Sequence, residues 1–254
     1  MSAKITVITI SYNCASDLED TIKSVVNQTF KEIEYIVVDG GSKDDTGEVL
    51  KKYNCKISKW ISEPDYGIYD AMNKGLKMAT GDYIIFMNAG DTFFEDESLG
   101  KISFDKFPNA DIFYGETLMI SEEGKELGLR TKKLPHNLNW KHFKRGMVVC
   151  HQAFVMKRIK APEYNLRYKL SADVEWVLKC LKESKQIIYT ETILARFLEG
   201  GASKKRHSES LQERFQIMKT YFGLFSTILS HIVFIIENTW MLLGFKSKYR
   251  KSNL

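Results

Sequence analysis

The first ninety residues alternate short apolar runs with segments of helical spacing, and few folds are compatible with that alternation. Apolar runs typical of strands buried in a parallel sheet are Ile5–Ile10, Tyr35–Val38, Ile57–Ile61 and the first half of Asp82–Phe93. Segments with apolar residues on one helical face lie between them: Asp17–Asn27, Asp44–Tyr53 and Ile68–Met78. We therefore predict an α/β fold whose sheet is mostly parallel and flanked by helices.

Polar residues follow each predicted strand, namely Tyr12, Asp39, Asp65 and Asp91. Because the carboxyl ends of parallel strands meet at one edge of a sheet, we expect these residues to gather there, where open α/β sheets bind ligands. No GxGxxG follows the first strand, and no GxxxxGK[ST] occurs in the chain. These absences argue against a dinucleotide fingerprint and a P-loop.

The turn Asn88-Ala89-Gly90-Asp91 ends the most central of these strands. A carboxylate at that position can hold a hard cation, and the cation can hold a diphosphate. An ordinary polar turn is the alternative interpretation of the same four residues.

The second part of the chain is less regular. Ile112–Ile120 and Glu126–Arg130 flank a Glu-Glu-Gly turn and predict a hairpin. Val148–Met156 has the composition of a strand and contains His151 and Gln152. We expect a helix over Ser171–Lys182, and further elements are expected at Ile187–Phe197 and at 208–221.

Residues 224–245 are long and apolar enough to suggest a membrane span, but His231, Glu237 and Asn238 interrupt them at a cost too high for a bilayer centre. At helical spacing the polar residues fall on one side and the apolar residues on the other, which predicts an amphipathic helix. Its apolar side, with Phe225, Leu229, Ile232, Ile236, Trp240 and Leu243, suits a membrane interface. Packing on the protein's own core or on a second subunit is the alternative.

The 254-residue chain has a formal net charge of +5, and basic residues cluster late in it. The clusters are Lys204, Lys205 and Arg206, then Lys246, Lys248, Arg250 and Lys251. They can meet phosphates or an anionic membrane surface, or form a solvated tail. The four cysteines form no CxxC pair and no secretory signal opens the chain, so we expect a cytoplasmic protein.

Taken in order, these motifs make the chain resemble the inverting nucleotide-sugar glycosyltransferases of family 2, which have the GT-A fold. The resemblance covers roughly residues 3–220 and is closest to bacterial enzymes of surface polysaccharide synthesis. The matching stretches in the first half are Ile-Thr-Ile-Ser-Tyr-Asn at 8–13, Gln-Thr-Phe at 28–30, Val-Val-Asp-Gly-Gly-Ser-Lys-Asp-Asp-Thr at 37–46 and Glu-Pro-Asp-Tyr-Gly-Ile-Tyr-Asp-Ala-Met-Asn-Lys-Gly at 63–75. The later ones are Ala-Thr-Gly-Asp at 79–82, Met-Asn-Ala-Gly-Asp at 87–91 and Ser-Ala-Asp-Val-Glu-Trp at 171–176.

The resemblance implies a set of donor-binding residues. Asp39 matches the residue that hydrogen-bonds the nucleotide base, a role its carboxylate can fill by accepting from a base N–H. Ser11 and Tyr12 match the loop under the nucleotide. The other implied donor-side residues are Asp65, Asn73 and Asn88. A turn aspartate is the alternative for Asp39, and bracing of a loop is the alternative for Asn73.

The resemblance also implies a divalent cation, Mn²⁺ or Mg²⁺, bound by Asp91. Here the sequence departs from the family pattern, because Asn88 leaves only one carboxylate in the Asp-x-Asp-Asp position. We expect weak metal affinity without the donor, since diphosphate oxygens and waters must supply the other ligands. His207 stands where some GT-A enzymes place a second ligand. A solvent-facing histidine, or a contact of 204–206 with the diphosphate, is the alternative.

Asp173 matches the family's catalytic base, at the start of the expected helix. An inverting transferase needs one base to deprotonate the attacking acceptor hydroxyl. The family often has Glu before this residue, where this chain has Ala172. Stabilisation of the helix N-terminus is the alternative role for Asp173, and Glu175 is expected to be a surface charge. His151 and Trp140 are candidate acceptor-side residues.

We therefore expect a GT-A domain over 1–221 and an amphipathic helix with a basic tail over 222–254. The expected activity is metal-dependent transfer of a hexose or N-acetylhexosamine, from a nucleotide sugar with UDP as the expected nucleotide, to a glycan or polyprenyl-linked glycan. The expected location is the inner face of the cytoplasmic membrane, and no nucleic acid partner is expected. A sugar nucleotidyltransferase and a non-catalytic sugar-nucleotide or glycan binding subunit are the alternatives.

Overall fold

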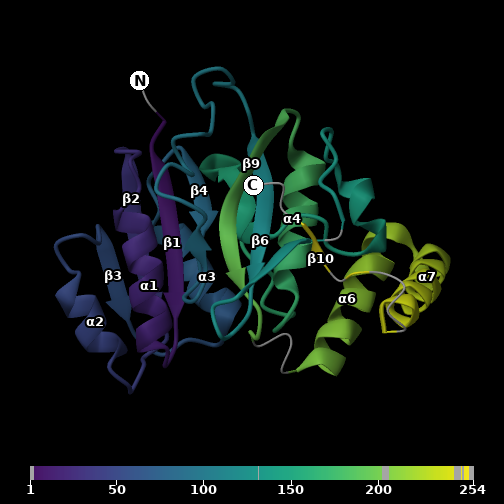
Figure 1. The fold of residues 1–254 in the computed structure, drawn as a ribbon, viewed down its shortest axis with the longest axis horizontal. Coiled ribbons are helices and arrows are strands. Elements are labelled where there is room, and N and C mark those ends of the chain that lie inside the picture. The colour runs from purple at the N-terminus through teal and green to yellow at the C-terminus, as the bar shows by residue number, and fades with distance from the viewer. Residues whose placement is uncertain (1–2, 131, 202–205, 243–246, 248, 252–254) are drawn as a thin grey trace.

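The computed structural model describes residues 3–130, 132–201, 206–242, 247 and 249–251 (Figure 1). Its strands are β1 (Ile5–Ser11), β2 (Ile33–Asp39), β3 (Lys59–Ser62), β4 (Tyr83–Phe86), β5 (Thr92–Phe93), β6 (Ile112–Ile120), β7 (Glu126–Arg130), β8 (Phe154–Lys157), β9 (Ile187–Leu198) and β10 (Tyr249–Arg250). Its α-helices are α1 (Ala15–Val26), α2 (Thr46–Lys52), α3 (Ile68–Met78), α4 (Ala172–Glu183), α6 (His207–Phe222) and α7 (Leu224–Leu242). Short 3-10 helices are η1 (Trp140–Arg145), η2 (His151–Ala153) and η3 (Arg158–Lys160).

One mixed sheet organises the molecule. Its strands follow the order β10-β7-β6-β8-β4-β1-β2-β3, while β9 pairs with β6 and β5. The strands from the first ninety residues are parallel to one another, as their continuous apolar character predicts. Antiparallel β8 then joins β4 to β6, and β9 pairs in parallel with β6, so the later half extends the sheet with a mixed pattern. The predicted α/β class with a mixed, mostly parallel sheet flanked by helices is confirmed.

The core occupies both faces of this sheet. Along β1, Val7 packs with α1 on one face, whereas Ile8 and Ile10 pack with α3 and α4 on the other. Trp176 of α4 is fully buried in the second layer. The two faces explain why β1 is continuously apolar and not alternating. They also bring the first turn of α4 toward the strand ends.

The stretch 148–156 differs from its expected extended form. Only Phe154–Lys157 is a strand, because the chain first makes the 3-10 turn η2, closed by the amide of Ala153 donating to the carbonyl of Cys150. Apolar composition alone could not distinguish these local structures. The turn places His151 and Gln152 next to Asn88 and Asp91, in the turn that follows β4.

α6 and α7 lie at one end of the molecule's long axis, and α2 and β3 lie at the other (Figure 1). α7 packs against α6 and η1, and β10 pairs with β7, so residues after 222 contact the sheet domain at two places. Within the described part of the chain, every helix is too short or too polar to cross a membrane.

Candidate active site at the strand ends

The carboxyl ends of β1, β2 and β3 form the first part of the candidate site. Ser11, Asp39 and Ser62 end neighbouring strands in register, and Asp39 is almost fully buried. Its carboxylate accepts hydrogen bonds from the Ser62 hydroxyl at 2.6 Å, the Ser42 amide at 2.9 Å and the Ser11 hydroxyl at 3.2 Å, as well as from the Ser42 hydroxyl. Asp39 therefore organises the turn that follows β2. This is the role of a turn aspartate, which the sequence left as the alternative to recognition of the nucleotide base.

Gly40 is the point on which Tyr12 and Asp65 converge. A Cβ added to Gly40 would lie 2.5 Å from Asp65 Oδ2 and 3.2 Å from Tyr12 Cδ2. Glycine therefore suits this close approach, and three of the four expected strand-end residues, Tyr12, Asp39 and Asp65, lie together here, whereas Asp91 contacts Gln152 and Leu198 instead. The Tyr12 side chain is 62% exposed and offers an aromatic surface at this edge.

Asn73 has a bracing role in the structure. Its Nδ2 donates to the carbonyl of Tyr164 at 3.0 Å, and its Oδ1 accepts from the Tyr164 amide at 2.7 Å. The amide is buried and both of its ends are used, so these contacts support the bracing alternative over direct contact with a donor.

Asp91 is buried at the end of the β4 turn. Its carboxylate accepts from Gln152 Nε2 at 2.6 Å and from the backbone amide of Leu198 at 3.1 Å. Burial raises the pKa of Asp91 to about 6, although these two hydrogen bonds act in the opposite direction. Asp91 therefore links the turn to both η2 and β9.

Asn88, three residues earlier, reaches the other member of the η2 pair. Its Nδ2 lies 3.2 Å from His151 Nε2, while its Oδ1 is buried and has no hydrogen-bond partner. An oxygen acceptor in that condition is suited to an external donor or a cation.

Asp173 lies in the first turn of α4 and faces the same histidine. Its Oδ1 accepts from the Tyr69 hydroxyl at 2.9 Å, and its Oδ2 is 3.8 Å from His151 Nδ1. Burial opposes ionisation, but His151, Arg214 and the Tyr69 hydroxyl together hold the pKa of Asp173 below its ordinary value. The carboxylate is thus kept ionised, as a general base must be.

His151 and Gln152 join the two halves of the site. His151 lies between Asn88 and Asp173, and Gln152 bonds Asp91, so η2 connects the turn after β4 to the first turn of α4. Sequence reasoning named His151 as an acceptor-side residue and assigned nothing to Gln152. A polar pair inside an apolar run was the signal that could have identified both.

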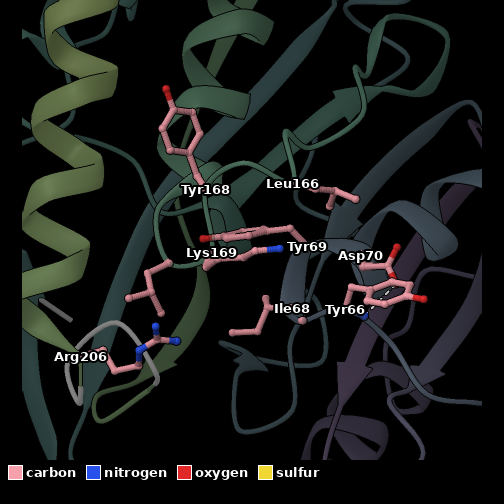
Figure 2. A pocket seen from close by; sticks show the side chains of 10 residues that line it. Tyr66, Ile68, Tyr69, Asp70, Leu166, Tyr168, Lys169 and Arg206 are labelled. Carbon is pink, nitrogen blue, oxygen red and sulfur yellow. Dashed lines mark hydrogen bonds between the residues drawn. The ribbon is translucent and has the colours of Figure 1, made fainter.

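A pocket of ≈ 300 Å³ opens beside this network (Figure 2). It is lined by Tyr66, Gly67, Ile68, Tyr69, Asp70, Leu166, Tyr168, Lys169, Leu170 and Arg206. Tyr69 belongs to both the pocket wall and the Asp173 hydrogen bond, so the pocket lies one side chain from the candidate base. Tyr66 is 86% exposed at the rim, where an aromatic face can stack against a sugar ring.

The metal ligands predicted from the sequence are not gathered into a three-ligand cluster in the described part of the chain. His207 is the exposed first residue of α6, and residues 204 and 205 lie outside the described residues. The oxygens present still fit a hard cation with few protein ligands. Asn88 Oδ1 is unpaired, and each Asp91 oxygen has a second lone pair beyond its hydrogen bond.

Comparison with known proteins identifies relatives across most of the chain. The family model described as "Glycosyl transferase family 2" matches residues 6–162, more than half of the chain. A "PGL/p-HBAD biosynthesis glycosyltransferase" of Mycobacterium bovis is 27% identical over 244 residues, which cover 92% of this chain and 90% of that protein. A cholesterol galactosyltransferase of Borreliella burgdorferi is 34% identical over 132 residues, covering 49% of this chain and 36% of that one.

Solved structures share the fold at low identity. TarS 1–349 of S. aureus in complex with UDP superposes with a TM-score of 0.67 at 17% identity, covering 85% of this chain and 64% of that one. The mannosyltransferase PcManGT of Pyrobaculum calidifontis, in complex with GDP-Man and Mn²⁺, gives a TM-score of 0.65 at 14% identity. It covers 98% of this chain and 83% of that one. These likenesses support the fold predicted from the sequence.

Proposed function

The chain belongs to glycosyl transferase family 2 and has the GT-A fold, and from this premise we propose that it is an inverting, metal-dependent transferase of a hexose or N-acetylhexosamine. Its donor is a nucleotide sugar, with UDP as the nucleotide. The observation that best supports this proposal is Asp173, a half-buried carboxylate held ionised beside a pocket at the strand-end edge.

The donor site is proposed at the edge formed by Tyr12, Gly40 and Asp65. Tyr12 supplies an exposed aromatic surface for a base, and glycine at 40 lets the Tyr12 ring and the Asp65 carboxylate lie close to the backbone. Asp39 supports the turn below, and it must exchange one of its four hydrogen bonds to accept from a base N–H. Fold neighbours crystallised with UDP, UDP-GlcNAc and GDP-Man support a nucleotide-sugar donor and leave the base to be tested.

A divalent cation, Mn²⁺ or Mg²⁺, is proposed at the turn after β4, with Asn88 and Asp91 as its protein ligands and His207 as a further candidate. The Mn²⁺ complex of PcManGT supports a divalent cation in this fold, and the choice of ligands rests on the unpaired Asn88 oxygen and the position of Asp91. When bound, such a cation stabilises the negative charge that develops on the departing nucleoside diphosphate. A second cysteine, histidine or carboxylate ligand is not required, because diphosphate oxygens supply ligands of their own.

Asp173 acts as the proposed general base. It removes the proton of the acceptor hydroxyl as that oxygen forms its bond to the anomeric carbon and the bond to the diphosphate oxygen breaks. His151 and Tyr69 fix the two carboxylate oxygens, so one of their remaining lone pairs faces the acceptor. One base and no covalent nucleophile give inversion at the anomeric carbon.

The acceptor is proposed to enter by the pocket of Figure 2, with its sugar against Tyr66. We propose a glycan or polyprenyl-linked glycan of surface polysaccharide synthesis, reached at the inner face of the cytoplasmic membrane through residues 222–254. A relative named cholesterol galactosyltransferase supports an acceptor with a lipid part.

Calorimetric titration with UDP, GDP and dTDP, each with and without Mn²⁺, tests the donor and the cation. We expect UDP to bind and Mn²⁺ to strengthen its binding. Binding of none of the three by folded protein would contradict the proposal and favour a non-catalytic subunit.

Asp173→Asn tests the base. The change removes the proton acceptor and keeps the side-chain shape, so sugar transfer should fall by about 10²–10⁴-fold while UDP binding persists. Release of pyrophosphate from a nucleoside triphosphate and a sugar phosphate, in place of sugar transfer, would instead indicate a sugar nucleotidyltransferase. Glu175→Gln, two residues further along α4, serves as the control. Glu175 was expected to be a surface charge, and that prediction is wrong, because its side chain is buried and pairs with Lys179 at 3.1 Å.

A further inference from the structure

α7 is amphipathic with its polar side turned inward. Thr227 is 1% exposed and Ser230 is 9% exposed, and the side chain of His231 packs edge-on against Phe215 of α6. The large apolar residues of the helix are instead exposed: Leu224, Phe225, Ile228, Leu229, Ile232, Phe234, Ile235 and Ile236. The amphipathic pattern predicted from the sequence is confirmed over these residues, whereas the side chains of Glu237, Trp240 and Leu243 lie outside the description.

This arrangement removes one of the alternatives left by the sequence. The apolar side of α7 does not pack on the protein's own core, since its members are 41–84% exposed. All except Phe234 fall within one side of the helix at 100° per residue. A contiguous apolar surface of this kind marks an interaction site.

A basic segment far away in the sequence borders the same helix. η1 packs against α7, and the ring of Trp140 stacks on that of Phe222 with centroids 5.3 Å apart. Lys141, Lys144 and Arg145 of η1 are exposed. Neither η1 nor residues 224–236 contain an acidic residue. The α7–η1 surface, defined as the exposed apolar side of α7 together with these three basic residues, is therefore apolar and cationic.

Building on the proposed contact of residues 222–254 with a membrane, we infer that the α7–η1 surface docks onto an anionic lipid bilayer, with α7 lying in the interface and η1 meeting the acidic headgroups. An apolar helix side bordered by cations is the combination that binds such interfaces. A second copy of the chain is the weaker fit. A two-fold contact through this surface would bring the two basic clusters close together.

The inferred docking has a consequence for the site. η1 also packs against α4, whose first turn carries Asp173. A bilayer beneath η1 and α7 would hold a lipid-linked acceptor beside the element that carries the candidate base.

Co-sedimentation of the full chain with vesicles tests the inference. The probes are vesicles of phosphatidylcholine alone and vesicles of phosphatidylcholine with about 30% phosphatidylglycerol. Binding to each is measured at about 0.1 M and about 1 M salt. We expect at least about tenfold stronger binding to the anionic vesicles, weakened at high salt. Equal binding to both vesicle types, or binding to neither, would overturn the inference without the use of any variant.

Two variants separate the apolar and cationic parts. Phe225→Ser/Ile232→Ser/Ile235→Ser should abolish binding, and Lys141→Glu/Lys144→Glu should remove the preference for anionic vesicles. The matched controls are Ile159→Ser, at a residue 74% exposed outside α7, and Lys56→Glu/Lys106→Glu, at two exposed lysines elsewhere. Controls that lose binding as completely as the test variants would count against this surface.

Light scattering of the wild type distinguishes docking onto lipid from association with a second copy of the chain. A monomer supports lipid docking, and a dimer that dissociates in the triple serine variant would overturn it. Circular dichroism of every variant shows that its fold persists, and UDP titration reports the donor site separately. Because UDP binding and vesicle binding are measured separately, loss of the docking inference would leave the proposed donor site standing, and the reverse also holds.

Discussion

At the residue scale, the candidate site is a set of polar side chains whose removal from water costs folding free energy. Asp91 and His151 are buried and Asp173 is half-buried, and each is retained by a named hydrogen-bond or charge partner. The strand-end positions of Asp39, Asp65 and Asp91 were predictable, because parallel strands must bring their carboxyl ends together. The partners were not predictable, because Gln152 and Tyr69 reach the site through tertiary packing.

His151 gives the first prediction at this scale. In His151→Gln, Asp173 loses the neighbour that most lowers its pKa, so that pKa rises. The acid limb of the kcat/KM profile should therefore move to higher pH, and activity should fall by up to about 100-fold as the carboxylate loses its orientation. The measurement is transfer rate against pH, extended below 3.8 so that it includes the wild-type acid limb.

His142→Gln, an exposed histidine of η1, is the control for that series. Tyr69→Phe should shift the acid limb in the same direction, since the hydroxyl also lowers the pKa of Asp173. A His151→Gln enzyme with an unmoved acid limb would show that Asp173 does not set it.

At the element scale, strand-helix alternation specified most of the sheet, and the exceptions have local causes. The ends of α3 coincide with the predicted Ile68–Met78, because the apolar stripe runs to both ends of the helix. β8 was predicted too long, because η2 is set by the turn from Cys150 to Ala153 and by the site contacts of its side chains. The side of α7 that faces the protein was not predictable either, because a helical pattern separates a polar side from an apolar side without showing which of them is buried.

A buried carboxylate also ties three of these elements together. Glu34 of β2 accepts from the Thr6 hydroxyl at 2.7 Å on β1, and from the amide and hydroxyl of Thr80 at 2.7 and 2.8 Å before β4. Lys59 of β3 adds a contact at 3.3 Å. Burial would raise the pKa of Glu34, but these donors lower it from 4.5 to about 2.

Glu34→Gln should reduce the free energy of unfolding at pH 7 by about 1–3 kcal/mol, the range that the pKa shift allows after discounting the exposed Lys59. Because the folded pKa is depressed, this stabilisation is present above pH 4.5 and is lost as the pH falls toward about 2. Urea unfolding of both proteins at pH 7 and pH 3 measures it. The exposed Glu32→Gln is the control, and a difference that does not shrink at pH 3 would disagree with the assignment.

At the scale of the whole molecule, the chain combines a proposed donor edge, a proposed base and an exposed apolar helix around one sheet. The positions of the first two follow from family motifs, because their residues follow strands or begin a helix at fixed places in the sequence. The α7–η1 surface depends on two segments separated by some eighty residues of sequence, and their adjacency exists only in the folded protein. How much the donor edge contributes to the folded state can be measured on the intact chain.

UDP with Mn²⁺ should stabilise the whole protein by mass action. At ligand concentrations about 100 times the Kd the gain is about 2.7 kcal/mol, or about 5–10 °C in Tm for a chain of this size. A chelator, or Asp91→Ala, should remove most of the Mn²⁺-dependent part, whereas Asp96→Asn, at an exposed residue of the next loop, should keep it. Because burial raises the pKa of Asp91 to about 6, protons compete with the cation below that pH, and the Mn²⁺-dependent shift should be larger at pH 7.5 than at pH 5.5. A shift that is the same at both pH values and survives the chelator would mean that the nucleotide binds without a cation at Asp91.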